Sequence, residues 1–95
     1  MEISVSANVV NVNGSIKTVS DFQDIKNALD RLKTNERKIV INLFDSISIT
    51  SSVIGYFNKL VLKDKIDLQI NIGKEQLMSL FDDLHLTEEF KAKKI

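Results

Sequence analysis

The sequence contains no cysteine and no proline. Without cysteine the chain cannot form a disulfide, a thiolate nucleophile or a zinc–thiolate site, which are the usual devices of small domains outside the cell. The opening residues, Met1-Glu2-Ile3-Ser4-Val5, lack the basic residue and the following apolar run of a signal peptide. We therefore expect a cytoplasmic protein.

An excess of charge of either sign is also missing. Thirteen Lys and Arg residues balance thirteen Asp and Glu residues, and the sequence pI is about 6.6. A protein that binds nucleic acid normally has a basic excess or a basic stripe, because phosphate neutralisation supplies much of its affinity. The nearest feature is the tail with Lys91, Lys93 and Lys94, which we interpret as a solvated, fraying chain end. The composition therefore predicts no nucleic-acid partner.

Long hydrophobic runs are absent as well. The uncharged stretch of residues 46–58 is rich in Ser and Thr and too short to cross a bilayer. The chain has 95 residues, of which 43% are hydrophobic and 27% charged, as in an average globular domain. We predict a single domain over residues 1–95, with no membrane insertion.

Three segments have patterns expected for strands, and in two of them apolar residues alternate with polar ones. The first is residues 3–13, where no clear turn decides between two strands and one bent strand. In residues 66–72 the alternation is strict and predicts one buried face. The third segment, Ile39-Val40-Ile41-Asn42-Leu43-Phe44, is apolar almost throughout, which favours a central strand covered on both faces.

Helical spacing of apolar residues marks three further segments. The first contains Phe22, Ile25, Ala28, Leu29 and Leu32, and Ser20 with Gln23 fits a capping box at its start. The second covers residues 51–65, and the third follows Gly73 and contains Leu77, Leu80, Phe81 and Leu84. Thr87 is expected to cap a short terminal helix that buries Phe90.

This order of elements predicts an α/β fold. Strands that alternate with helices imply right-handed crossovers and parallel pairing. The sheet should be mixed but mostly parallel, with helices mainly on one face and an antiparallel strand from the opening residues at an edge. Ligands and partners of open α/β sheets meet the carboxyl ends of the strands, which directs attention to residues 45–55. Ser51 and Ser52, taken by themselves, are ordinary N-cap residues of the helix that follows.

The turn Thr50-Ser51-Ser52-Val53-Ile54-Gly55, placed between a buried strand and a helix, resembles the STAS domain. This family includes sulphate transporters and anti-sigma-factor antagonists, and its pattern here is Asp, Ser or Thr, Ser, Gly, an apolar residue, Gly. The resemblance covers nearly the whole chain, including Gly14 and the segment Leu84-His85-Leu86. It departs at Thr50, where the family has Asp, and at Val53, where it has Gly. Ser15 and Lys17 also stand where the family often has acidic residues.

The resemblance implies a non-catalytic, protein-binding regulatory domain. In the antagonists, a partner that is both serine kinase and anti-sigma factor phosphorylates the serine after the aspartate, which corresponds to Ser51 here and less well to Ser52. A phosphoserine is favoured at a helix N-terminus but repels a docking partner by its charge. The partner-binding residues implied are Thr50, Ser51, Ser52, Val53, Tyr56 and Lys17, with Tyr56 as an exposed interface anchor.

Two other functions remain open. The absence of the family's acidic residues at Ser15, Lys17 and Thr50 favours a constitutive assembly subunit of a larger signalling or transporter complex. Such a subunit would have no phosphoswitch. The sequence leaves open whether the chain forms a homodimer. A small enzyme is the least favoured, and would need a substrate beside Asp45 and Ser48. We expect no cofactor and no metal, since Asp82 and Asp83 diverge at a helix end and His85 is expected to pack or hydrogen-bond there.

Overall fold

The computed structural model describes all residues from 1 to 95 and contains one five-stranded sheet with the strand order β1-β2-β3-β4-β5. The strands are β1 (Glu2–Ser6), β2 (Val9–Asn13), β3 (Lys38–Leu43), β4 (Asp67–Ile72) and β5 (Lys93–Lys94). Only β1 and β2 pair antiparallel, and the other neighbours are parallel. The prediction of a mixed, mostly parallel sheet with an antiparallel edge strand is confirmed.

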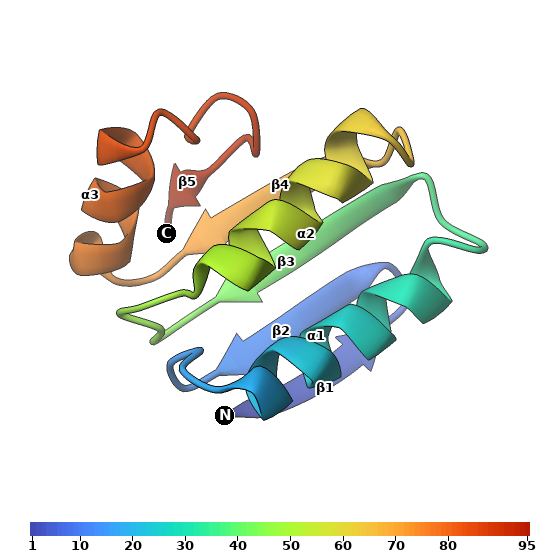
Figure 1. The fold of residues 1–95 in the computed structure, drawn as a ribbon, viewed down its shortest axis with the longest axis horizontal. Helices are drawn as coiled ribbons and strands as arrows, with labels where there is room; N and C mark the ends of the chain where they lie inside the picture. The colour runs from blue at the N-terminus through green and yellow to red at the C-terminus, as the bar shows by residue number, and fades with distance from the viewer.

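Three helices complete the fold: α1 (Val19–Leu32), α2 (Ser51–Leu62) and α3 (Glu75–Asp83). Figure 1 shows α1 and α2 side by side on one face of the sheet, with α3 beside the carboxyl end of β4 and next to β5. The predicted arrangement of helices mainly on one face is confirmed. None of the three helices has the length and apolar character needed to cross a membrane.

The opening residues form two strands, which settles the alternative left open by the sequence. A turn at Ala7 and Asn8 joins β1 to β2, and Ala7 takes a left-handed φ of 52°. This is the conformation that Gly adopts most readily at the first position of a hairpin turn. The turn was not recognisable in the sequence because alanine is an unusual residue there.

The core lies between the sheet and its helices and is built from one face of each inner strand. In β3, Ile39, Ile41 and Leu43 are buried, whereas Val40 and Asn42 on the other face are only half-buried. The prediction that this strand is covered on both faces is therefore wrong. The strand is central, but α1 and α2, which follow β2 and β3 in the chain, both lie on the same side of the sheet.

The uncovered face of the sheet carries a row of asparagine amides. Asn11, Asn42 and Asn71 lie opposite one another on β2, β3 and β4. The Asn42 Nδ2 donates to Asn11 Oδ1 at 2.9 Å, and the Asn71 Nδ2 donates to Asn42 Oδ1 at 2.8 Å. Each amide keeps further donor and acceptor positions for water, so this face remains solvated without a covering layer.

Helix α1 begins two residues before the predicted start. Thr18 is the N-cap: its Oγ1 accepts from the Asp21 N–H at 3.0 Å, while the Asp21 carboxylate accepts from the Thr18 N–H at 3.1 Å. The capping box therefore belongs to Thr18 and Asp21, and not to Ser20 and Gln23. An aspartate completes this box in place of the usual Glu or Gln.

The C-terminal segment differs most from expectation. Residues after Thr87 form turns and the short strand β5 instead of a terminal helix. Phe90 is fully buried, as predicted, with its ring edge-on to Phe57 and Phe81. The tail is not a free chain end as expected: the Lys91 Nζ lies 2.6 Å from the Asp67 carboxylate, and Lys93 and Lys94 pair with β4.

Candidate functional site

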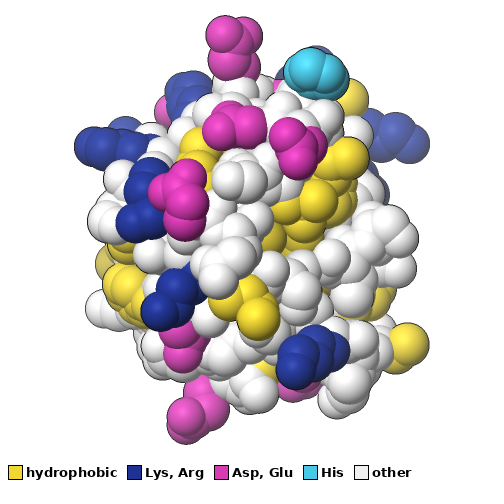
Figure 2. Space-filling model, turned by 90° about the vertical axis from the view of Figure 1, so that its left-hand side faces the viewer, with side chains coloured by type: hydrophobic (Ala, Val, Ile, Leu, Met, Phe, Trp, Pro, Cys, Tyr) yellow, Lys and Arg dark blue, Asp and Glu magenta, His cyan; other side chains and the backbone are white.

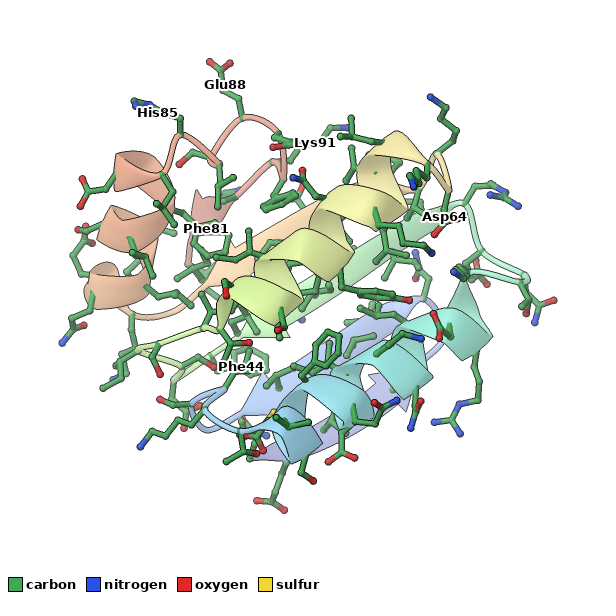
Figure 3. The ribbon with its side chains drawn as sticks, viewed as in Figure 1. Phe44, Asp64, Phe81, His85, Glu88 and Lys91 are labelled. Atoms are coloured by element: carbon green, nitrogen blue, oxygen red, sulfur yellow. The ribbon has the colours of Figure 1, made fainter.

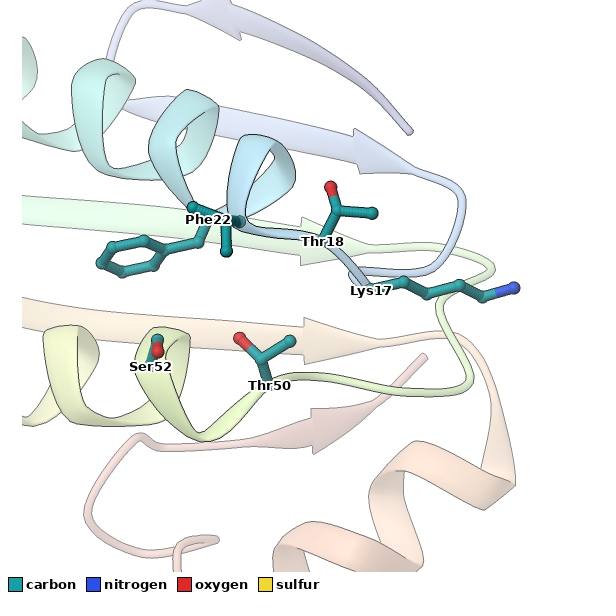
Figure 4. A pocket seen from close by; sticks show the side chains of 6 residues that line it. Lys17, Thr18, Phe22, Thr50 and Ser52 are labelled. Carbon is teal, nitrogen blue, oxygen red and sulfur yellow. The ribbon is translucent and has the colours of Figure 1, made fainter.

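The N-terminal ends of α1 and α2 lie side by side at the carboxyl ends of β2 and β3, and a shallow groove of about 270 Å³ separates them. The groove is lined by Lys17, Thr18, Val19, Phe22, Thr50 and Ser52. In Figure 4, Thr18 and Phe22 lie on one side and Thr50 and Ser52 on the other, while the Lys17 chain extends outward. The sequence placed the site at this end of the sheet, and the structure brings three of the predicted residues, Lys17, Thr50 and Ser52, to one groove.

The start of α2 assigns different roles to three consecutive hydroxyl residues. Thr50 has extended backbone, with φ of −88° and ψ of 156°, and its Oγ1 accepts from the Val53 N–H at 3.4 Å. Thr50 is therefore the N-cap, and the interpretation of Ser51 and Ser52 as caps is wrong. Both serines are exposed in the first turn, and their hydroxyls make no hydrogen bond within the chain.

The loop before α2 is held against the loop that follows β2. The Ser46 Oγ donates to the Gly14 carbonyl at 2.6 Å, and the Gly14 N–H donates to Asp45 Oδ1 at 2.6 Å. Ser46 is fully buried, and the Ile47 N–H donates to Ser15 Oγ at 3.2 Å. These bonds fix the position of the α2 N-terminus relative to α1, and Asp45 is engaged in them.

Two of the predicted partner-binding residues are in the core. Val53 is fully buried and Tyr56 is 6% exposed, so neither presents its side chain to a partner. Val53, Tyr56, Phe57 and Leu60 recur at helical spacing along the side of α2 that faces the sheet and α1. The prediction of an exposed Tyr56 is wrong because the buried side of α2 is wide enough to include both aromatic residues.

Tyr56 joins the two helices. Its hydroxyl donates to Asp30 of α1, and the ammonium groups of Lys26 and Lys59 lie 5.6 and 5.7 Å from its ring centre. Burial, together with the adjacent Asp30 carboxylate, raises the pKa of Tyr56. Burial also acts to raise the pKa of Asp30, but hydrogen bonds from Lys26 and Tyr56 outweigh it and lower that pKa to about 2. The Tyr56–Asp30 contact is therefore structural and sets the spacing of α1 and α2.

Exposed apolar side chains near this end of the sheet were not identified from the sequence. Val19 is 81% exposed at the first residue of α1, and Phe44 and Ile47 in the loop after β3 are 43% and 51% exposed. Figure 2 shows hydrophobic side chains gathered on the face that contains the strand ends, and Figure 3 places Phe44 there. The sequence signal that could have indicated this exposed surface is the presence of Phe44 and Ile47 in a loop that is otherwise rich in Ser.

A second cavity, of about 350 Å³, lies after α3 and is lined only by polar and charged residues, namely Asp82, His85, Thr87 and Glu88. His85 is exposed, with a left-handed φ of 58°, and its side chain points to solvent (Figure 3), so the expectation that it packs at the helix end is wrong. Thr87 hydrogen-bonds to the Asp82 carboxylate. Asp82, Asp83 and His85 do not form a group that holds a metal ion.

No protein-family model matches the chain, and no curated protein matches its sequence.

Proposed function

We propose that this chain is a non-catalytic, cytoplasmic protein-binding domain, resembling the anti-sigma-factor antagonists of the STAS family, whose binding is switched by phosphorylation of Ser51. The observation that carries the proposal is the position of Ser51 as the exposed first residue of α2. Because Thr50 caps the helix, the Ser51 hydroxyl is not needed as the N-cap of α2.

The position of Ser51 tolerates a phosphate. The first turn of a helix has unpaired N–H groups and the positive end of the helix dipole, both of which favour an anion. The first turn of α2 contains no acidic residue that would repel the phosphate. Phosphorylation should therefore leave the fold intact and change only the surface.

The surroundings of Ser51 fit a protein partner. The groove between α1 and α2 and the exposed side chains of Val19, Phe44 and Ile47 offer both apolar and polar groups, as protein interfaces do. A phosphate adds a charge of about −1.5 to −2, which must lose its hydration when a partner covers the site. The expected consequence is loss of binding.

The order of elements and the turn from Thr50 to Gly55 support the likeness to STAS antagonists, and the partner expected from it is a serine kinase that also acts as an anti-sigma factor. The departure at Val53 does not obstruct docking, because the Val53 side chain is buried against the sheet. Ser51 and Ser52 therefore occupy the outer surface of the first turn.

A constitutive assembly subunit without a phosphoswitch is the second candidate. It is favoured by the residues that stand where antagonists often have acids. Lys17 is basic, and the Ser15 hydroxyl accepts a hydrogen bond from the Ile47 N–H, which is a structural role. In this case the same surface binds its partner permanently.

The two candidates differ in their response to charge at Ser51. We expect a kinase-like partner to co-purify from the native cell with the tagged wild type and with Ser51→Ala, and to be lost with Ser51→Asp. Ser79→Asp, an exposed serine of α3, is the matched control and should retain the partner. If Ser51→Asp retains the same partners while its circular dichroism is unchanged, the switch is refuted and the assembly subunit stands.

A further inference from the structure

The two edges of the sheet differ in their protection against pairing with another strand. The β5 edge is only two residues long, and both are lysines. The β1 edge is five residues long, Glu2-Ile3-Ser4-Val5-Ser6, with no proline, no lysine and no bulge in its pairing with β2. Short strands, lysines, prolines and bulges are the devices that block edge pairing. The β1 edge has none of them except a single charge at Glu2.

The hairpin register shows which backbone groups of β1 are free. Ser6 and Val9 flank the two-residue turn and are opposite each other, so they form its hydrogen-bonded pair. Hydrogen-bonded and non-hydrogen-bonded pairs alternate along antiparallel strands. Ser4 is therefore bonded to Asn11, and Ile3 and Val5 direct their N–H and C=O groups away from the sheet.

We propose that β1 pairs antiparallel with β1 of a second copy of this chain, with the two Ser4 residues opposite each other on the two-fold axis. In this register Ile3 lies opposite Val5 of the other copy, and each such pair exchanges both N–H···O bonds. Glu2 lies opposite Ser6, so no like charges meet. The strand is self-complementary, as a two-fold interface requires.

The side chains of β1 support the pairing. Ile3 is half-buried and Val5 is 45% exposed, both on the face that α1 covers. In the proposed register these residues become cross-strand neighbours. The pairing therefore removes from water an apolar side chain that the single chain leaves exposed.

The charges on α1 favour a second copy over an unrelated strand. Lys26 and Asp30 contact Tyr56 and so face α2. Asp24 and Arg31, seven residues apart, lie on the opposite flank, toward the β1 edge; both are exposed, and neither is in an ion pair within the chain. A two-fold axis at Ser4 makes the two α1 helices antiparallel and brings Asp24 of one toward Arg31 of the other.

Sedimentation velocity over a wide range of concentrations tests the interface. The wild type should pass reversibly from 10.8 kDa to twice that mass. Val5→Lys places a charge on the edge and should keep the protein at 10.8 kDa. Leu62→Lys, which places the same charge on an exposed apolar residue at the end of α2, should associate like the wild type. A wild type that stays monomeric, or a Val5→Lys variant that still dimerises, overturns the proposal.

Charge reversal provides a test that does not touch the strand. Asp24→Arg should weaken association about tenfold, because arginine then faces arginine across the axis. Combining it with Arg31→Asp restores opposite charges and should restore association. Failure of the double variant to recover refutes the paired-helix arrangement. The result is independent of the proposed switch, because the two Ser51 sites lie at opposite ends of the dimer.

Discussion

At the scale of single residues, the most informative contrast is between Thr50 and Ser51. The two hydroxyl residues are adjacent, but only Thr50 has the extended backbone of an N-cap and a hydrogen bond to the Val53 N–H. Ser51 is already helical, and its side chain projects into solvent. A residue in the cap position contributes to folding, whereas its neighbour is available for regulation.

This contrast predicts different effects on stability. Thr50→Ala should lower the free energy of unfolding by about 1 kcal/mol through loss of the cap. Ser51→Ala should change it by less than about 0.5 kcal/mol, as expected for an exposed residue without partners. Urea denaturation of both variants measures the difference. A larger loss for Ser51→Ala would assign the capping role to Ser51.

At the scale of elements, Gly55 and Gly73 differ in the space around them, and this difference decides whether an added Cβ stabilises or destabilises the fold. Gly55 lies inside α2, and a Cβ there would meet no atom within 4 Å. Gly73 follows β4 and donates its N–H to the Leu43 carbonyl at 2.8 Å, and a Cβ there would lie 2.0 Å from the Phe44 carbonyl oxygen. Close approach of the chain after β3 to the chain after β4 requires glycine at position 73.

Substitution by alanine should therefore have opposite signs at the two positions. Gly55→Ala should stabilise the protein by about 0.5–1 kcal/mol, because alanine is the better helix former. Gly73→Ala should destabilise it by about 1–3 kcal/mol, because the Phe44 backbone must move. Thermal and urea unfolding of the pair provide the comparison. A stabilising Gly73→Ala would show that the loops after β3 and β4 are not in contact.

At the scale of the whole molecule, aspartates with lowered pKa values link stability to pH. The pKa of Asp64 is lowered by hydrogen bonds from Lys33 and Lys59, and the pKa of Asp67 is lowered by a hydrogen bond from Lys91. Burial acts to raise the pKa of Asp30, but hydrogen bonds from Lys26 and Tyr56 outweigh it and lower the pKa to about 2. These contacts connect α1, the end of α2, β4 and the C-terminal segment. The folded state therefore favours the ionised carboxylates across most of the molecule.

A group whose pKa is lower in the folded state than its ordinary value of 3.8 stabilises the fold above that value. We expect the contribution of these aspartates to be fully present at neutral pH, to decline as the pH falls below about 4, and to be lost near pH 2. Urea denaturation at a series of pH values measures the decline. Asp30→Asn should be less stable at pH 7 and lose less stability on acidification, whereas equal losses would exclude Asp30 from the linkage.

What the sequence determined by itself is the order, type and direction of the elements from α1 to α3. The two-residue period of strands and the 3.6-residue period of helices are local signals, and alternating strands and helices require parallel crossovers. These rules placed the candidate site at the carboxyl ends of β2 and β3, where Lys17, Thr50 and Ser52 meet. The fold class was therefore predictable from patterns within short stretches of chain.

Only the tertiary structure decided what covers each face. It placed α1 and α2 on the same side of the sheet, which left Val40 half-exposed, and it packed α2 against α1, which buried Tyr56. It also turned the last residues into β5, because Phe90 fills the space between Phe57 and Phe81. A residue's spacing specifies the face on which it lies, but the burial of that face depends on segments distant in the sequence.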